Sequence, residues 1–269
     1  RFGEAFRDER LHAVADLRHH MRKELTESMA ALEALEACGA VCEPRGVSQV
    51  GARAFLLDCY CSVGLTTSLL ATAFPEAVVV GVDRDPRLVG RTHFKHPDRH
   101  AIVTADMLSF EDRFDTLAAG RRFVGITAVH ACGLLALKPI ELFRRWIKSA
   151  SARGRRSGVL VLVPCCVPVG YLGTRAGQDS EPEADASAAA TAVAGAPESD
   201  DYARWCRHLA AEVAAVDPHI TCGLQQVGGI LSPRNTVIHA AWRGPGDCDF
   251  GDDDDHEDDG NHEEAFLSG

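Results

Sequence analysis

The sequence predicts an α/β protein with an open, mostly parallel β-sheet that ends in an antiparallel hairpin. From residue 53 onward, short apolar runs alternate with helical segments, which is typical of βαβ crossovers. The run 159–163 is apolar at every position, as expected when both faces of a strand are buried. The last two strand-like runs are separated by a short connection containing Gly, Pro and Asn, which favours antiparallel pairing.

The composition agrees with a globular chain. The 269 residues are 46% hydrophobic and 25% charged, which is ordinary for a domain with a sizeable core. The longest apolar run is interrupted by prolines and is too short to span a bilayer, so we expect no membrane association.

Residues 1–38 form a predicted amphipathic helix, and Gly39 is its expected end. Apolar residues recur every three or four positions: Val14, Leu17, Met21, Leu25, Met29, Leu32 and Leu35. A stripe of this kind packs against a core, so we expect the helix to cover an edge or a face of the sheet. We assign residues 1–45 to an N-terminal helical extension.

The main domain is predicted over residues 46–246. Its expected strands are 54–59, 77–82, 100–104, 123–129, 158–163, 219–227 and 236–242. Its expected helices are 65–74, 86–94, 135–152 and 201–216. Right-handed crossovers make the first five strands parallel, with the fourth and fifth as neighbours.

Two segments are predicted to lie outside this core. Residues 173–199 are of low complexity and without periodicity, so we expect a flexible surface insert. The net charge of −11 comes from a tail over 247–269, which holds eleven acids and no Lys or Arg. Such a run repels itself and buries nothing, so we expect it to be disordered. The rest of the chain is neutral, without a general attraction for nucleic acid.

The chain holds ten cysteines, most of them within apolar runs and not in the spacing of a small disulfide framework. We therefore expect free thiols in an intracellular reducing compartment, cytoplasmic or organellar. The first residue is Arg1 and not Met, so we expect the N-terminus, with any targeting peptide, to be incomplete.

Ligands of open parallel sheets bind beyond the carboxyl ends of the strands. The segment from Asp58 to Gly64 follows the first strand and precedes a helix, whose free N–H groups suit a carboxylate. Gly64 lets the backbone approach a ligand closely. Asp83 closes the second strand about 20 residues later, where a carboxylate can accept both hydroxyls of a ribose. The alternative for Asp83 is a helix cap.

His130-Ala131-Cys132-Gly133 and Pro164-Cys165-Cys166 end two strands that should be neighbours. His130 is the candidate general base or orienting group, because its ordinary pKa lies near neutrality. Cys132, near a helix N-terminus, is expected to have a lowered pKa. Successive side chains of a strand diverge, so the Cys165–Cys166 pair is not expected to direct both sulfurs at one ion, and no metal is predicted. The alternative is that these thiols only fill space in the core.

These motifs resemble class I S-adenosyl-L-methionine (SAM) dependent methyltransferases. His-x-Cys-Gly and Pro-Cys-Cys are similar to a branch with tRNA ribose methyltransferases, methyltransferase-like proteins and an uncharacterised algal, plant and protist subgroup. The resemblance implies a Rossmann-like seven-stranded methyltransferase sheet, SAM as cofactor, and His130 and Cys165 at the active site, with Cys165 shaping the acceptor pocket. Asp106 would accept from the adenine amino group, beside an apolar residue. The implied cofactor-binding residues are Asp58, Tyr60, Ser62, Gly64, Asp83, Asp106 and Met107.

The chain departs from the family pattern at two places. Tyr60 and Ser62 occupy positions that are usually glycine, and no histidine follows Cys166. The tRNA specificity is therefore not carried over, and the acceptor remains open among RNA, a small molecule and a protein. A basic cluster suits RNA, but cations at a helix C-terminus also have a dipole explanation; it comprises Arg144, Arg145, Lys148, Arg153, Arg155 and Arg156.

Two other classes compete with the methyltransferase. The glycine-poor loop favours a binding or assembly protein that has lost activity. An NAD-dependent oxidoreductase would share the first half of the sheet, but the terminal hairpin disfavours it. The sequence does not predict the oligomeric state.

Overall fold

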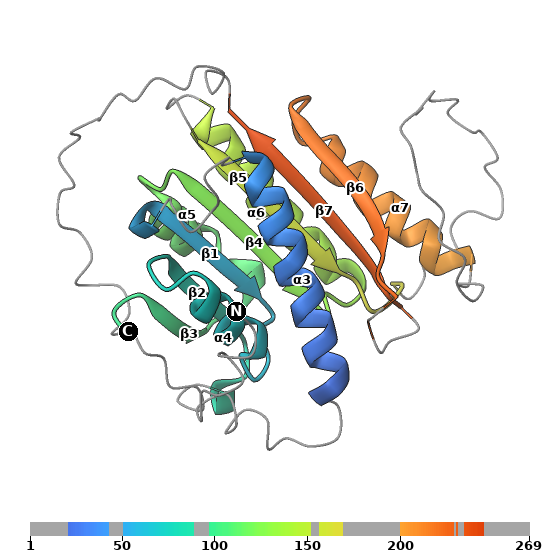
Figure 1. Ribbon diagram of the computed structural model, residues 1–269, viewed down its shortest axis with the longest axis horizontal. Helices are drawn as coiled ribbons and strands as arrows, with labels where there is room; N and C mark the ends of the chain where they lie inside the picture. Colours follow the sequence, from blue (N-terminus) through green and yellow to red (C-terminus); the bar gives the residue numbers. More distant parts are fainter. Residues whose placement is uncertain are drawn as a thin grey trace.

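The computed structural model describes residues 21–42, 51–88, 97–151, 156–168, 200–228, 230 and 234–244. These residues form a seven-stranded sheet with the order β3-β2-β1-β4-β5-β7-β6 (Figure 1). Its strands are β1 Ala54–Cys59, β2 Val78–Asp83, β3 His100–Thr104, β4 Phe123–Val129, β5 Ser157–Val163, β6 Ile220–Gln226 and β7 Thr236–Arg243.

The first five strands are parallel, and β7 is antiparallel to both β5 and β6. This confirms the predicted Rossmann-like methyltransferase sheet with its antiparallel C-terminal hairpin. β1, β4 and β5 are buried along their whole length, which explains their nearly continuous apolar sequences. β6 lies at the edge and is only partly covered.

Helices cover both faces of the sheet (Figure 1). On one face lie α3, Met21–Cys42, and α4, Leu65–Ala73. On the other lie α5, Glu111–Ala118, α6, Leu137–Ala150, and α7, Asp200–Ala214. Alternate strand residues therefore enter different cores.

The helix α3 packs across the sheet and contacts β5, β7 and α4. Its stripe residues Leu32 and Leu35 are buried, which confirms its covering role; residues 1–20 lie outside the described residues. The predicted end at Gly39 is wrong, because α3 continues to Cys42. A glycine inside a helix costs only about 1 kcal/mol. Gly39 is itself buried here, so packing offsets that cost.

Local differences from the predicted elements concern short segments. The helix α5 was not predicted from the sequence, because an eight-residue helix with few buried side chains shows little periodicity. The expected helix over 86–94 is a short 3-10 turn, Pro86–Leu88, as far as the described residues extend. The turn Gly133–Ala136 precedes α6, which therefore starts two residues later than predicted.

Several expectations fall on residues that are not described. The insert 173–199 and the tail 247–269 both lie outside the described residues. Among the helices that are described, none has the length and the apolar character to cross a membrane.

Candidate functional site

The loop after β1 has a glycine-like backbone, although only one of its residues is a glycine. Tyr60 and Ser62 have φ angles of 59° and 50°, and Gly64 has a φ of 81°. A left-handed conformation costs an ordinary residue about 1–2 kcal/mol. Backbone strain of this kind clusters at functional sites, where the surrounding structure maintains it.

Asp83, at the end of β2, holds this loop in place. The Ser62 N–H donates to Asp83 Oδ2 at 3.0 Å, and the Asp85 N–H donates to Asp83 Oδ1 at 2.9 Å. On the other side, the Tyr60 hydroxyl donates to the Leu135 carbonyl at 2.9 Å. Each carboxylate oxygen has a second lone pair, so Asp83 retains acceptor capacity for a ribose.

Asp58 lies deeper than the sequence suggests. Its carboxylate is buried and accepts hydrogen bonds from the hydroxyls of Thr67, at 2.7 Å, and Thr127, at 3.3 Å. Burial raises the pKa of Asp58 to about 7, against the lowering effect of both threonines. Asp58 thus joins β1 to α4 and β4, and it supports the loop from within the core.

The turn after β3 presents a different apolar residue from the one predicted. Asp106 Oδ1 accepts from the Leu108 N–H at 2.9 Å and caps the 3-10 turn Met107–Ser109. Met107 is 3% exposed and belongs to the core, whereas Leu108 is 59% exposed. Leu108 is therefore the apolar side chain that this turn offers to a ligand. An acid at the capping position, Asp106, is the sequence signal that could have indicated this turn.

His130 has a partner that the sequence did not reveal. It follows β4 with a φ of 63°, and its Nε2 lies 2.8 Å from Oε2 of Glu27 on α3. Glu27 is 2% exposed, while the His130 side chain is 33% exposed. The buried carboxylate can orient the imidazole. Nothing in the local sequence of α3 distinguishes Glu27 from a solvent-facing acid.

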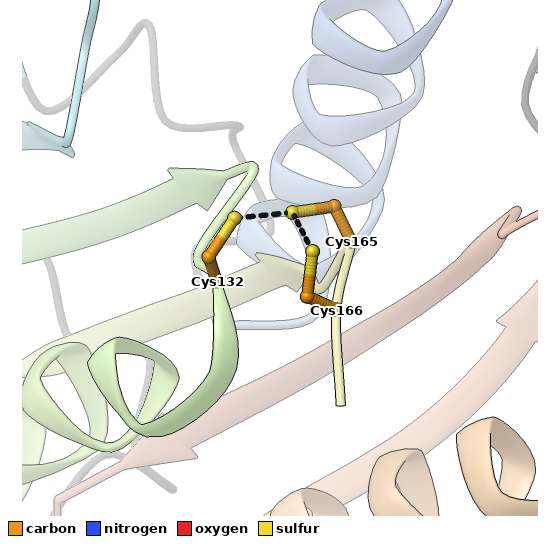
Figure 2. A group of neighbouring side chains, drawn as sticks. All are labelled: Cys132, Cys165 and Cys166. Carbon is orange, nitrogen blue, oxygen red and sulfur yellow. Dashed lines mark hydrogen bonds between the residues drawn. The ribbon is translucent and has the colours of Figure 1, made fainter. Parts of the chain in front are cut away.

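Three cysteines meet at the ends of β4 and β5 (Figure 2). The Sγ atoms of Cys132 and Cys165 are 2.7 Å apart, and those of Cys165 and Cys166 are 3.5 Å apart. The structure thus confirms that the two strand ends are neighbours. It also brings the vicinal pair to one side, contrary to the predicted divergence.

The three thiols differ electrostatically. Burial raises the pKa of Cys132 and of Cys165. Burial also acts to raise the pKa of Cys166, but hydrogen bonds with the other two thiols and the charge of Arg234 outweigh it, so the pKa is lowered. The lowered pKa expected for Cys132 therefore falls on Cys166, whereas burial is the largest influence on Cys132 and raises its pKa.

Tyr202 on α7 and Arg234, which lies just before β7, hold the cysteine segment. The guanidinium of Arg234 donates to the Cys165 carbonyl and lies 5.6 Å from the ring centre of Tyr202. The Tyr202 hydroxyl donates to the Pro164 carbonyl at 2.7 Å. Both contacts join segments far apart in sequence, so local patterns could not indicate them.

Two arginines of the basic cluster, both on α6, are paired with acids. Arg145 lies 2.6 Å from Asp115, and Arg144 lies 3.8 Å from Glu212. Arg153 and Arg155 lie outside the described residues. For Arg144 and Arg145, ion pairing within the fold explains the positive charge without RNA.

No protein-family model and no curated protein matches the sequence. Among solved structures, the chain is similar to the plantazolicin methyltransferase BpumL in complex with SAH, at 9% identity and a TM-score of 0.47 over 89% of this chain and 92% of that one. Cofactor-bound Rv0187 from MTB matches at 19% identity and a TM-score of 0.42, over 81% and 90%.

The Methanococcus jannaschii fibrillarin pre-rRNA processing protein matches at 11% identity and a TM-score of 0.40, over 72% of this chain and 69% of that one. All three likenesses are distant. The fold of this chain is defined by its own strand order and directions.

Proposed function

We propose that this protein is a SAM-dependent methyltransferase. SAM would lie beyond the carboxyl ends of β1, β2 and β3, and its methyl group would face the ends of β4 and β5. The observation that carries the proposal is the loop after β1, where Tyr60 and Ser62 keep left-handed conformations and Ser62 is bonded to Asp83. A left-handed backbone is unfavourable for residues other than glycine. Its presence beside a strand-end carboxylate is typical of a ligand-binding loop.

The residues present suit the chemical groups of SAM. Asp83 has lone pairs for the ribose hydroxyls, and the N-terminus of α4, after Gly64, suits a carboxylate. Asp106 and the exposed Leu108 offer an acceptor and an apolar surface for the adenine. Tyr60, Ser62 and Gly64 would contribute backbone contacts, while Asp58 and Met107 would support the site from the core.

SAM would supply an electrophilic methyl group, and the protein would act mainly by positioning the acceptor. His130 would accept the proton of the acceptor nucleophile, with Glu27 holding its imidazole. Cys165 would line the acceptor side. RNA, a small molecule or a protein could each present the nucleophile, and the paired arginines of α6 give no preference for RNA.

A second candidate is a binding or assembly protein that has kept the fold without the activity. It is favoured by Asp83, whose two carboxylate oxygens already accept backbone N–H groups. An NAD-dependent oxidoreductase is not supported, because β7 is antiparallel where that class continues with a parallel strand.

Calorimetric titration of the full chain with SAM and with its demethylated product distinguishes the two candidates. We expect binding by the wild type and a loss of about 10- to 100-fold for Asp83→Ala, the effect of removing a charged hydrogen-bond acceptor. Asp98→Ala is the matched control, since Asp98 lies before the amino end of β3, away from the carboxyl ends of the strands where SAM is proposed to bind. A wild-type protein that binds neither compound would overturn the methyltransferase and leave the second candidate.

A further inference from the structure

We propose that Cys132, Cys165 and Cys166 form a binding site for a soft metal ion such as Zn²⁺, with one coordination position open. This site is independent of the methyltransferase proposal, since it rests on three thiols from the ends of β4 and β5 (Figure 2). Thiolates are the protein ligands that Zn²⁺ and Cu⁺ prefer.

The spacing of the sulfurs suits a single ion. All three Sγ atoms lie within 4.8 Å of one another, and the closest pair is 2.7 Å apart. A Zn–S bond of about 2.3 Å in tetrahedral geometry separates sulfurs by about 3.8 Å. The Cys132–Cys165 and Cys165–Cys166 spacings, 2.7 and 3.5 Å, are both shorter than this value, so binding of an ion requires these sulfurs to move apart.

The backbone explains why a vicinal pair can reach one point. β5 ends at Val163, so Cys165 and Cys166 lie beyond the extended strand in which side chains alternate. Cys166 pairs with Cys132 in an isolated parallel bridge, and the Gly133 N–H donates to the Cys166 carbonyl at 3.3 Å. This arrangement turns both sulfurs of the pair toward Cys132 (Figure 2).

The surroundings suit a charged cluster. Three thiolates and one Zn²⁺ carry a net negative charge, and the guanidinium of Arg234 lies beside them, where it donates to the Cys165 carbonyl. Tyr202 holds the Pro164 carbonyl and so fixes the segment that carries two ligands. Cations and hydrogen bonds around the ligands are what orient a metal site.

The fourth position would face solvent. Cys132 is exposed, and Cys165 and Cys166 are half-buried, so the cluster is accessible from outside. His130 is close in sequence, but its Nε2 is occupied by Glu27. Three protein ligands with one open position are the arrangement of zinc sites that bind water or a substrate group.

The test uses the full chain, reduced, stripped of metal and kept free of oxygen. Zn²⁺ is titrated against a chromophoric chelator, and Co²⁺ is titrated for its thiolate charge-transfer absorption, which carboxylates and imidazoles do not produce. We expect one ion per chain. We expect each of Cys132→Ser, Cys165→Ser and Cys166→Ser to weaken Zn²⁺ binding by at least about 100-fold. Loss of a residue that only supports a ligand already costs about 10- to 100-fold, and these variants remove a ligand itself. Cys222→Ser is the matched control, because Cys222 is a half-buried thiol on β6 outside the cluster.

Alkylation of the wild type, mapped by mass spectrometry, keeps the test valid if the serine variants do not fold. Added Zn²⁺ should protect Cys132, Cys165 and Cys166 and leave the labelling of Cys222 unchanged. The proposal is overturned if Co²⁺ produces no thiolate absorption or if Zn²⁺ protects none of the three. None of these measurements needs SAM, so a failure here is distinct from a failure of the proposed function.

Discussion

Glu27 on α3 and His130 at the end of β4 approach to 2.8 Å, between Oε2 and Nε2. The N-terminal helix therefore does more than cover the sheet, since it supplies a buried carboxylate to the candidate active site. A second link, the 2.8 Å contact between the hydroxyls of Ser28 and Thr66, joins α3 to α4, the helix that follows the loop after β1.

The Glu27–His130 pair should be energetically coupled. His130→Ala removes the nearest partner of the buried Glu27 carboxylate and leaves Lys23 Nζ at 3.7 Å. Breaking a fully buried pair costs about 3–5 kcal/mol. Because His130 is one-third exposed, we expect about 1–3 kcal/mol in the free energy of unfolding measured with urea. Adding Glu27→Gln to His130→Ala should recover most of this loss. Glu24→Gln in the same background is the control, and an additive effect of Glu27→Gln would contradict the coupling.

Asp58 should make stability depend on pH. Its pKa is about 7 in the folded protein and near 3.8 in the unfolded chain. Between these two values, the folded state therefore holds a proton that the unfolded state has lost. Stability therefore falls as pH rises from about 4 to 7, by up to roughly 4 kcal/mol. Asp58→Asn should flatten this decline in urea unfolding measured across the window. Asp112→Asn, at an exposed acid on α5, should retain the wild-type slope; equal slopes for both variants would refute the assignment.

Ser62→Gly should raise stability or leave it unchanged. The left-handed backbone at Ser62 costs about 1–2 kcal/mol. Glycine removes this strain, while its greater freedom in the unfolded chain costs about 0.5–1 kcal/mol. Thermal unfolding should therefore show an equal or higher midpoint. Ser151→Gly, at a position with a φ of −56°, should lower the midpoint, and a similar drop at both sites would argue against strain in the loop.

Tyr202→Phe should loosen the cysteine segment. It removes the 2.7 Å hydrogen bond to the Pro164 carbonyl in a buried environment, which costs about 1–2 kcal/mol. We expect a lower free energy of unfolding and faster hydrogen exchange over residues 165–167. Tyr60→Phe is the matched control, since its hydroxyl bonds to Leu135 at an exposed site and should matter less. A larger effect at Tyr60 would contradict the role given to Tyr202.

The sequence alone predicted the parallel core strands and the hairpin closely. The predicted bounds of β1, β3 and β4 agree with the structure, because continuous apolar runs between polar turns are a strong local signal. Short elements were less well predicted. The helix α5 was not predicted, and the predicted end of α3 was too early. Packing against the sheet, and not local propensity, decides whether such segments are helical.

The sequence also predicted that the candidate site residues lie at one edge of the sheet, since parallel strands bring their carboxyl ends together there. Which side chains reach the surface was decided only by the tertiary structure. Packing buried Asp58 and Met107, exposed Leu108, and placed Glu27 beside His130. It also turned Cys165 and Cys166 toward Cys132, since the chain leaves the extended strand conformation after Val163. Contacts between distant segments depend on how layers pack, and no local pattern encodes that.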